Sequence, residues 1–181
     1  GIGDFSDLGQ LVEKAAAWGA HFVGLNPIHA LYPANPESAS PYSPSSRRWL
    51  NLAYINVEAV PEFLANERLK ADVASPAFQQ HLASLRAKEN VDYTGVIETK
   101  IGMLRQVFDE ARFSAERQAA FDAFVAAGGD SLQQQAAFDA LQAHFYGKGE
   151  NAWGWPVWPD AFRDYHNPAV AAWMQDHSQD V

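Results

Sequence analysis

The stretch from Ser38 to Arg48 combines the residue types in this sequence that are best suited to binding a ligand. It holds a tyrosine between two prolines, several serines and two closing arginines. The prolines restrict the backbone, so the tyrosine and the hydroxyls are ordered at low entropic cost. Tyrosine can stack on the C–H face of a sugar ring, and serine hydroxyls can exchange hydrogen bonds with its OH groups. Three interpretations remain open: a plain loop, a sugar pocket, or a polyproline ligand, which Pro41-x-x-Pro44 approximates.

A sugar pocket that also cut its ligand would need two carboxylates, about 5 to 5.5 Å apart in a retaining enzyme. The loop from Pro27 to about Leu50 supplies only Glu37. The remaining candidate acids lie on expected helices with apolar stripes, where an acid usually faces water; they are Glu13, Asp109, Glu110, Glu116 and Asp122. No catalytic residue is therefore predicted within this chain.

Other classes of chemistry are not indicated. The histidines show no partner in metal-ligand register, so no metal site is expected. The opening Gly-Ile-Gly-Asp-Phe-Ser imitates a dinucleotide fingerprint, but Ser6 replaces the third glycine and Asp4 would meet the pyrophosphate, so no cofactor is expected. A net charge of -9 and a pI near 5.0 argue against nucleic acid or an anionic membrane as a partner. The absence of cysteine suits a cytoplasmic location.

The elements expected to position the loop alternate between helix and strand. Residues 6–19 have a helical stripe, with Ser6 or Asp7 as N-cap and Gly19 as the end. Residues 20–25 are apolar and partly β-branched, which predicts a strand buried on both faces. A second short strand is expected over 53–57. The intervening loop is too rich in proline and serine to be a helix or a strand. This order is the unit of an α/β layer, in which substrate meets the loop beyond the strand.

Helical periodicity dominates from residue 61 onward. One predicted stripe faces a partner helix and consists of Ile97, Ile101, Leu104, Phe108 and Ala111. Two helices, 115–127 and 131–144, are expected to form a hairpin around Gly128-Gly129. The aromatic residues of 153–158 are expected mainly to pack a domain junction, and Pro168 is expected to open a helix.

Four motifs closely resemble bacterial 4-alpha-glucanotransferases, the amylomaltases or disproportionating enzymes of glycoside hydrolase family seventy-seven. The resemblance covers essentially the whole chain in order. The motifs are Gly-Ile-Gly-Asp-Phe-Ser-Asp-Leu at the start, Val-Gly-Leu-Asn-Pro-Ile-His-Ala-Leu from residue 23, Ser-Pro-Tyr-Ser-Pro-Ser-Ser-Arg-Arg from residue 40 and Tyr-Ile-Asn-Val-Glu-Ala-Val-Pro from residue 54.

The resemblance implies an α/β fold: a partial TIM (β/α)8 barrel segment with a mostly helical inserted subdomain. Residues 1–60 would be the early barrel segment with its substrate loop, 61–150 the helical subdomain, and 151–181 a Trp-rich junction with helices returning to the barrel. It also implies an enzyme that transfers α-1,4-glucan segments between maltooligosaccharides by a retaining double displacement. An Asp nucleophile, a Glu acid/base and a stabilising Asp would perform it.

Those acids lie in Arg-x-Asp, Glu-Asp-Leu-Gly and His-Asp-Asn motifs, none of which occurs here. The chain is therefore expected to be an amino-terminal fragment that is inactive alone and has the remainder of its own catalytic domain as a partner. By the resemblance, Ser40 and Tyr42 line the sugar site, and Asn26, Pro27 and His29 form its floor. The alternative is a stand-alone carbohydrate-binding or protein-interaction module.

Overall fold

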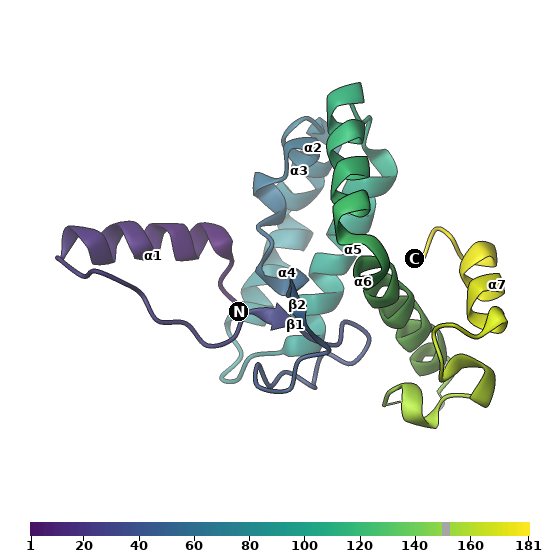
Figure 1. Ribbon diagram of the computed structural model, residues 1–181. Helices are drawn as coiled ribbons and strands as arrows, with labels where there is room; N and C mark the ends of the chain where they lie inside the picture. The colour runs from purple at the N-terminus through teal and green to yellow at the C-terminus, as the bar shows by residue number, and fades with distance from the viewer. Residues whose placement is uncertain (150–152) are drawn as a thin grey trace. The chain divides into compact units, whose positions relative to one another are not determined.

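The computed structural model of the protein describes residues 1–149 and 153–181, and Figure 1 shows its helices and strands. The chain divides into two compact units. Unit 1 comprises Gly1–Leu31 and Pro36–Phe113, and unit 2 comprises Tyr32–Asn35 and Ser114–Val181. Both units are mainly helical, and unit 1 also contains a two-stranded sheet. Among the described residues, no helix has the length and apolar character needed to span a lipid bilayer.

Helix α1, Phe5–Ala17, confirms the first predicted helix, but its cap lies earlier than expected. Asp4 is the N-cap: its Oδ1 accepts hydrogen bonds from Ser6 N at 2.8 Å and Asp7 N at 3.1 Å. Asp7 returns the interaction, since its Oδ2 accepts from Asp4 N at 2.9 Å. This reciprocal capping box satisfies N–H groups that lack helical partners. The helix is followed by Gly19 with φ 85°, a conformation suited to glycine.

The predicted strand over residues 20–25 is wrong. Residues 22–28 have no regular secondary structure, and the side chain of Phe22 is 85% exposed. A strand buried on both faces needs hydrogen-bonding neighbours at its edges and a layer over each face. Within the described part of the chain, no segment supplies them.

The second predicted strand, 53–57, is also wrong. Two short 3-10 helices, Leu52–Tyr54 and Val57–Ala59, occupy this stretch. Asn51 Oδ1 accepts a hydrogen bond from Ala53 N at 2.9 Å, and Asn56 Oδ1 accepts one from Glu58 N at 3.0 Å. These local side-chain bonds offer the backbone an alternative to strand pairing and favour tight turns.

Two strands instead occur where only irregular loop was expected. Strand β1, His29–Ala30, pairs antiparallel with β2, Ser46–Leu50. His29 lies opposite Leu50 and Ala30 opposite Ser46, with an irregularity in register between the two pairs. The prolines lie between the strands rather than within them, so the ladder loses no donor. The strands bring the two ends of the serine-rich loop together.

Four helices build the rest of unit 1, and they confirm the predicted helical region. They are α2 (Pro61–Leu64), α3 (Glu67–Ala74), α4 (Pro76–Arg86) and α5 (Tyr93–Glu110). Their core is a cluster of Phe63, Leu69, Val73, Met103 and Val107. The buried side of α5 matches the predicted stripe at Ile97 and otherwise differs from it: the other buried residues are Val96, Met103 and Val107, whereas Phe108 is 63% exposed. Beyond Ile97, the buried residues Met103 and Val107 lie one position before the predicted Leu104 and Phe108.

Unit 2 is built on α6, Ala115–Gly147. The predicted separation of two helices at Gly128-Gly129 is confirmed, because the backbone of Gly129 is non-helical (φ 49°, ψ -146°). The predicted hairpin is wrong, because the two helices continue across a kink within α6 and do not fold back on each other (Figure 1). A left-handed φ at this position suits glycine and locates the break where the sequence predicted it. Helix α7, Pro168–Asp176, begins at the predicted proline.

The aromatic residues of unit 2 divide into buried and exposed groups. Trp158 and Trp173 are 2% and 9% exposed and belong to a core with Leu141, Phe145 and Val170. Both tryptophans therefore pack within the core of unit 2, and the predicted packing of a domain junction stays a prediction. Trp153 and Trp155 are more than half exposed and are not part of this core.

Candidate functional site

The loop between β1 and β2 is closed at its base by Ser45. Its backbone N donates to Ala30 O at 2.9 Å, and its Oγ lies 3.1 Å from Ala30 O and 2.6 Å from Leu31 O. The backbone contact extends the antiparallel pairing by one residue before β2, and the hydroxyl contacts tie Ser45 to the end of β1 and to Leu31. Residues 38–44 therefore project from a base whose two ends are held together.

A tight turn presents Tyr42 within this loop. Ser43 N donates to Ser40 O at 3.1 Å, which places Pro41 and Tyr42 at the centre of a four-residue turn. Proline at the second position matches the φ angle that such a turn requires. The Tyr42 side chain is strongly exposed at 68%.

The structure brings together two of the predicted site residues, Tyr42 and Asn26. Tyr42 Oη donates to Asn26 Oδ1 at 3.0 Å, across sixteen positions of the sequence. This bond orients the ring while its faces remain accessible to solvent. Pro27 and His29 are partly buried beside the sheet, and His29 pairs with Leu50 in the ladder. Sugar contacts stay predictions for all five residues: Ser40, Tyr42, Asn26, Pro27 and His29.

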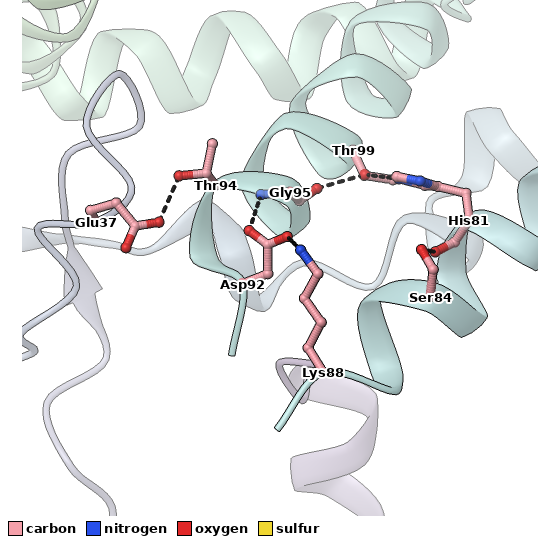
Figure 2. Close-up of polar contacts among 8 residues, drawn as sticks. All are labelled: Glu37, His81, Ser84, Lys88, Asp92, Thr94, Gly95 and Thr99. Carbon is pink, nitrogen blue, oxygen red and sulfur yellow. Dashed lines mark hydrogen bonds and ion pairs between the residues drawn. The ribbon is translucent and has the colours of Figure 1, made fainter. Parts of the chain in front are cut away.

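The first turn of α5 lies against this loop through Glu37. Thr94 Oγ1 donates to Glu37 Oε1 at 2.7 Å, as Figure 2 shows. Asp92 is the N-cap of α5, and its Oδ1 accepts from Gly95 N at 2.8 Å. Lys88 forms an ion pair with the other oxygen of Asp92. The Lys88 ammonium and the Gly95 N–H hold the pKa of Asp92 below its usual range, so this cap is a carboxylate at neutral pH.

Helix α5 is tied to α4 by a polar chain that Figure 2 also shows. Thr99 Oγ1 donates to Gly95 O at 2.7 Å and lies 2.8 Å from His81 Nε2. Because the threonine hydroxyl has a single proton, its oxygen must accept from His81 Nε2 in this arrangement. Ser84 Oγ donates to His81 O at 2.7 Å.

Lys100 ties α5 to the turn that follows β2. Its ammonium donates to Ala53 O and, at 2.9 Å, to Ile55 O. Burial lowers the pKa of Lys100, although the nearby Asp4 and Asp7 carboxylates oppose that change. Helix α5 thus holds both the serine-rich loop, through Glu37, and the end of the sheet, through Lys100.

A cavity of about 530 Å³ in unit 1 lies beside this frame. Its lining combines apolar side chains such as Phe78 and Met103 with the charged side chains of Asp4, Arg86 and Lys100. None of the predicted sugar-site residues lines it. The described residues contain no group of three or more histidine, cysteine, aspartate or glutamate side chains that could hold a metal ion.

The sequence did not reveal Thr94 as a support of the loop, nor Lys100 as a support of the turn that follows β2. Thr94 is an ordinary residue in the first turn of a helix, and its partner lies 57 positions away. Glu37 gave a signal, because it is the only acid between Pro27 and Leu50. The sequence showed that this acid was isolated but not what it binds.

Comparison with known structures defines the class to which this architecture belongs. The structure is similar to that of an amylomaltase from Corynebacterium glutamicum, with a TM-score of 0.71 and 34% identity over 97% of this chain and 24% of that one. At this identity and coverage, the two described units correspond to part of an amylomaltase fold.

Sequence comparison gives the family. A family model described as 4-alpha-glucanotransferase matches residues 1–181, and the chain belongs to this family of glycosyl-transferring enzymes. A 4-alpha-glucanotransferase of Haemophilus influenzae is 34% identical over 189 residues, which cover 100% of this chain and 27% of the relative. A 4-alpha-glucanotransferase of Mycobacterium tuberculosis is 34% identical over 194 residues, or 100% of this chain and 25% of the relative. The chain thus spans about a quarter of these relatives.

Proposed function

We propose that the chain is part of a 4-alpha-glucanotransferase that transfers α-1,4-glucan segments between maltooligosaccharides by a retaining double displacement. These residues supply sugar contacts, and the carboxylates that break and remake the bond come from the remainder of the catalytic domain. Membership of the family supports this assignment. The single acid of the loop, Glu37, accepts a hydrogen bond from Thr94 and lacks a second carboxylate in the loop to work with.

The observation that carries the proposal is the presentation of Tyr42. Its ring is exposed while its hydroxyl is bound to Asn26, so the ring is both accessible and oriented. The C–H face of a glucose unit can stack on such a ring, and orientation before binding reduces the entropic cost of the contact. The Asn26 side-chain amide N–H can donate to a glucose hydroxyl beside it. Ser40, Pro27 and His29 complete the proposed sugar site.

The proposal also covers the architecture of the complete enzyme. Residues 1–60 form an early segment of a (β/α)8 barrel, 61–150 a helical subdomain, and 151–181 a junction that returns to the barrel. In that setting, residues 20–25 would gain the strand neighbours that they lack within this chain. The reaction requires no cofactor, because carboxylates perform both displacement steps. The cysteine-free sequence suits a cytoplasmic enzyme.

The proposal is tested by changing Tyr42 in the complete enzyme and following glucose release and longer oligomers from maltotriose. Tyr42→Ala should lower kcat/KM by about threefold to tenfold, the range expected for one aromatic contact. Tyr42→Phe keeps the ring but loses the hydrogen bond to Asn26, so its kcat/KM should fall between those of wild type and Tyr42→Ala. Tyr146→Ala, which truncates an exposed tyrosine of α6, serves as the matched control.

Two results would count against the proposal. Wild-type kinetics in the Tyr42→Ala enzyme would return Tyr42 to a purely structural role. Binding of maltotriose by the complete protein without any transfer would favour a carbohydrate-binding module.

A further inference from the structure

We infer that the Glu37–Thr94 hydrogen bond is a latch that holds the Tyr42 loop against α5, and that Glu37 is a positioning residue for the sugar bound at Tyr42. The inference rests on the proposed function for its kinetic consequence. The latch itself concerns the geometry of unit 1 alone. Glu37 is exposed, yet its carboxylate lies 2.7 Å from the Thr94 hydroxyl.

Thr94 is a rigid partner for this latch because the first turn of α5 is closely packed against α4. A Cβ placed on Gly95 would lie 2.7 Å from Leu85 Cδ2 and 2.7 Å from Asp92 Oδ2. Such a distance is closer than carbon atoms can approach, so any larger residue at position 95 would have to displace the Leu85 methyl group and the Asp92 carboxylate. Leu85 is itself buried at 6% exposure. The Thr94 hydroxyl is therefore presented by a helix end that cannot shift easily.

The latch is one of three hydrogen-bonding contacts that hold the short segment from Glu37 to Ser45 in place. Glu37 is bound to α5, Tyr42 to Asn26, and Ser45 to the carbonyl groups at the end of β1. No more than five positions separate consecutive supports. Pro41 and Pro44 restrict the backbone between them. Movement at Glu37 is thus passed along a stiff segment to the turn that presents Tyr42.

The location of Glu37 also favours a carboxylate over other acceptors. Thr94 lies in the first turn of α5, where unpaired backbone N–H groups give the helix end partial positive charge. The negative charge of Glu37 is stabilised there. If the Glu37 side chain were truncated, the Thr94 hydroxyl would donate its hydrogen bond to water instead. Glutamine keeps an oxygen that can accept the hydrogen bond and loses only the charge. Glu37→Gln therefore removes only the negative charge, whereas Glu37→Ala removes both the charge and the hydrogen bond to Thr94.

The first experiment measures the latch without reference to activity. Hydrogen exchange of the amides in 38–46 is compared in wild type, Glu37→Ala, Glu37→Gln and Thr94→Val. Glu37→Ala and Thr94→Val should speed exchange in this segment by about threefold to tenfold, the loss expected for one hydrogen bond, and should leave exchange within α4 unchanged. Glu37→Gln should stay within about twofold of wild type. Glu98→Ala, which truncates an exposed acid on the same helix, is the control.

The second experiment measures the kinetic consequence in the complete enzyme with maltotriose. Glu37→Ala and Thr94→Val should each raise KM by about threefold to tenfold with a smaller change in kcat. Glu37→Gln and Thr94→Ser should restore values near wild type. The double variant Glu37→Ala/Thr94→Val should be no worse than either single variant, because both remove the same bond.

The outcomes separate the latch from the proposed function. Unchanged exchange in both single variants, or fully additive effects in the double variant, would overturn the latch. Faster exchange without any glucan transfer by the complete wild-type enzyme would leave the latch standing and remove the proposed function. If Glu37→Ala does not fold, Thr94→Val decides the question, since valine preserves the shape of threonine.

Discussion

Asp139 makes the stability of unit 2 depend on pH, and its replacement by asparagine should stabilise the protein at neutral pH. The side chain lies on α6, where Gln135 Nε2 is 3.1 Å from both of its carboxylate oxygens. Burial raises the pKa of Asp139 from 3.8 to about 6, and the hydrogen bond from Gln135 opposes this only in part. Between these two pKa values, the folded protein therefore holds a proton on Asp139 that the unfolded chain has released.

The sign and size of the effect follow from that difference in pKa. Between about pH 4 and pH 6 the folded state binds more protons than the unfolded state, so stability falls as the pH rises through this range. Above pH 6 the carboxylate is charged in both states, and the folded protein bears the full free-energy cost of burying that charge. At about 1.36 kcal/mol per pKa unit the upper limit is about 3 kcal/mol. Because the side chain is only partly buried by surface area, we expect about 1 to 2 kcal/mol.

The assay is equilibrium urea unfolding of wild type and Asp139→Asn at pH 7.5 and pH 4.5. The variant should be more stable by about 1 to 2 kcal/mol at pH 7.5, and its advantage should fall to about a third at pH 4.5. Asp122→Asn is a close control, because Asp122 accepts from Gln118 four residues earlier on the same helix but is exposed. Equal stability of Asp139→Asn and Asp122→Asn at pH 7.5 would refute the reasoning.

Three further predictions concern the frame that supports the loop. Gly95→Ala should destabilise unit 1 by about 1 to 3 kcal/mol in urea unfolding, because the new methyl group overlaps Leu85, and a neutral result would show that α4 and α5 can move apart. Lys100→Met should cost about 1 to 3 kcal/mol, because it leaves two carbonyl groups without their donor, and full stability would mean that water replaces it. Asp92 has a lowered pKa, so its capping contribution should be complete above about pH 4 and be lost only as the pH falls through the lower folded value. Circular dichroism of Asp92→Asn from pH 2 to pH 5 tests this, since the variant should lack that acid-dependent loss of helix.

The helices could be predicted because their signals lie within each element. Asp4 to Asp7, Gly129 and Pro168 all mark helix starts or breaks by their own conformational or hydrogen-bonding properties. The errors at these positions are shifts of a few residues or a kink in place of a hairpin. A periodic pattern predicts which face of a helix is apolar. An error of one residue in the position of that face already changes which side chains are buried, as the exposed Phe108 shows.

The strands could not be predicted, because a strand depends on partners that its own residues do not reveal. Residues 20–25 have the composition of a buried strand, yet no described segment pairs with them. Residues 53–57 alternate like a strand, but Asn51 and Asn56 bond to the backbone locally and favour 3-10 turns.

The candidate site could be predicted only in its exposed part. The Ser-Pro-Tyr turn is a local pattern, and the resemblance to 4-alpha-glucanotransferases implied that Asn26 lies beside Tyr42, which their hydrogen bond bears out, while the sugar site itself stays a prediction. The hydrogen bond between Glu37 and Thr94 joins side chains of two segments that are far apart in the sequence. Such a contact follows no regular residue spacing, so the sequence alone could not predict it. The sequence therefore singled out the exposed Tyr42, whose contact with a sugar stays a prediction, and missed the Glu37–Thr94 contact that supports its loop.

The central claim is that these residues grip a glucan and depend on acids elsewhere to cut it. The most direct measurement compares transfer from maltotriose by the 181-residue chain alone with transfer by the complete protein that contains it. The account predicts no glucose release and no longer oligomers from the chain alone, and both products from the complete protein. Sustained transfer by the chain alone, or its absence from the complete protein, would contradict the account.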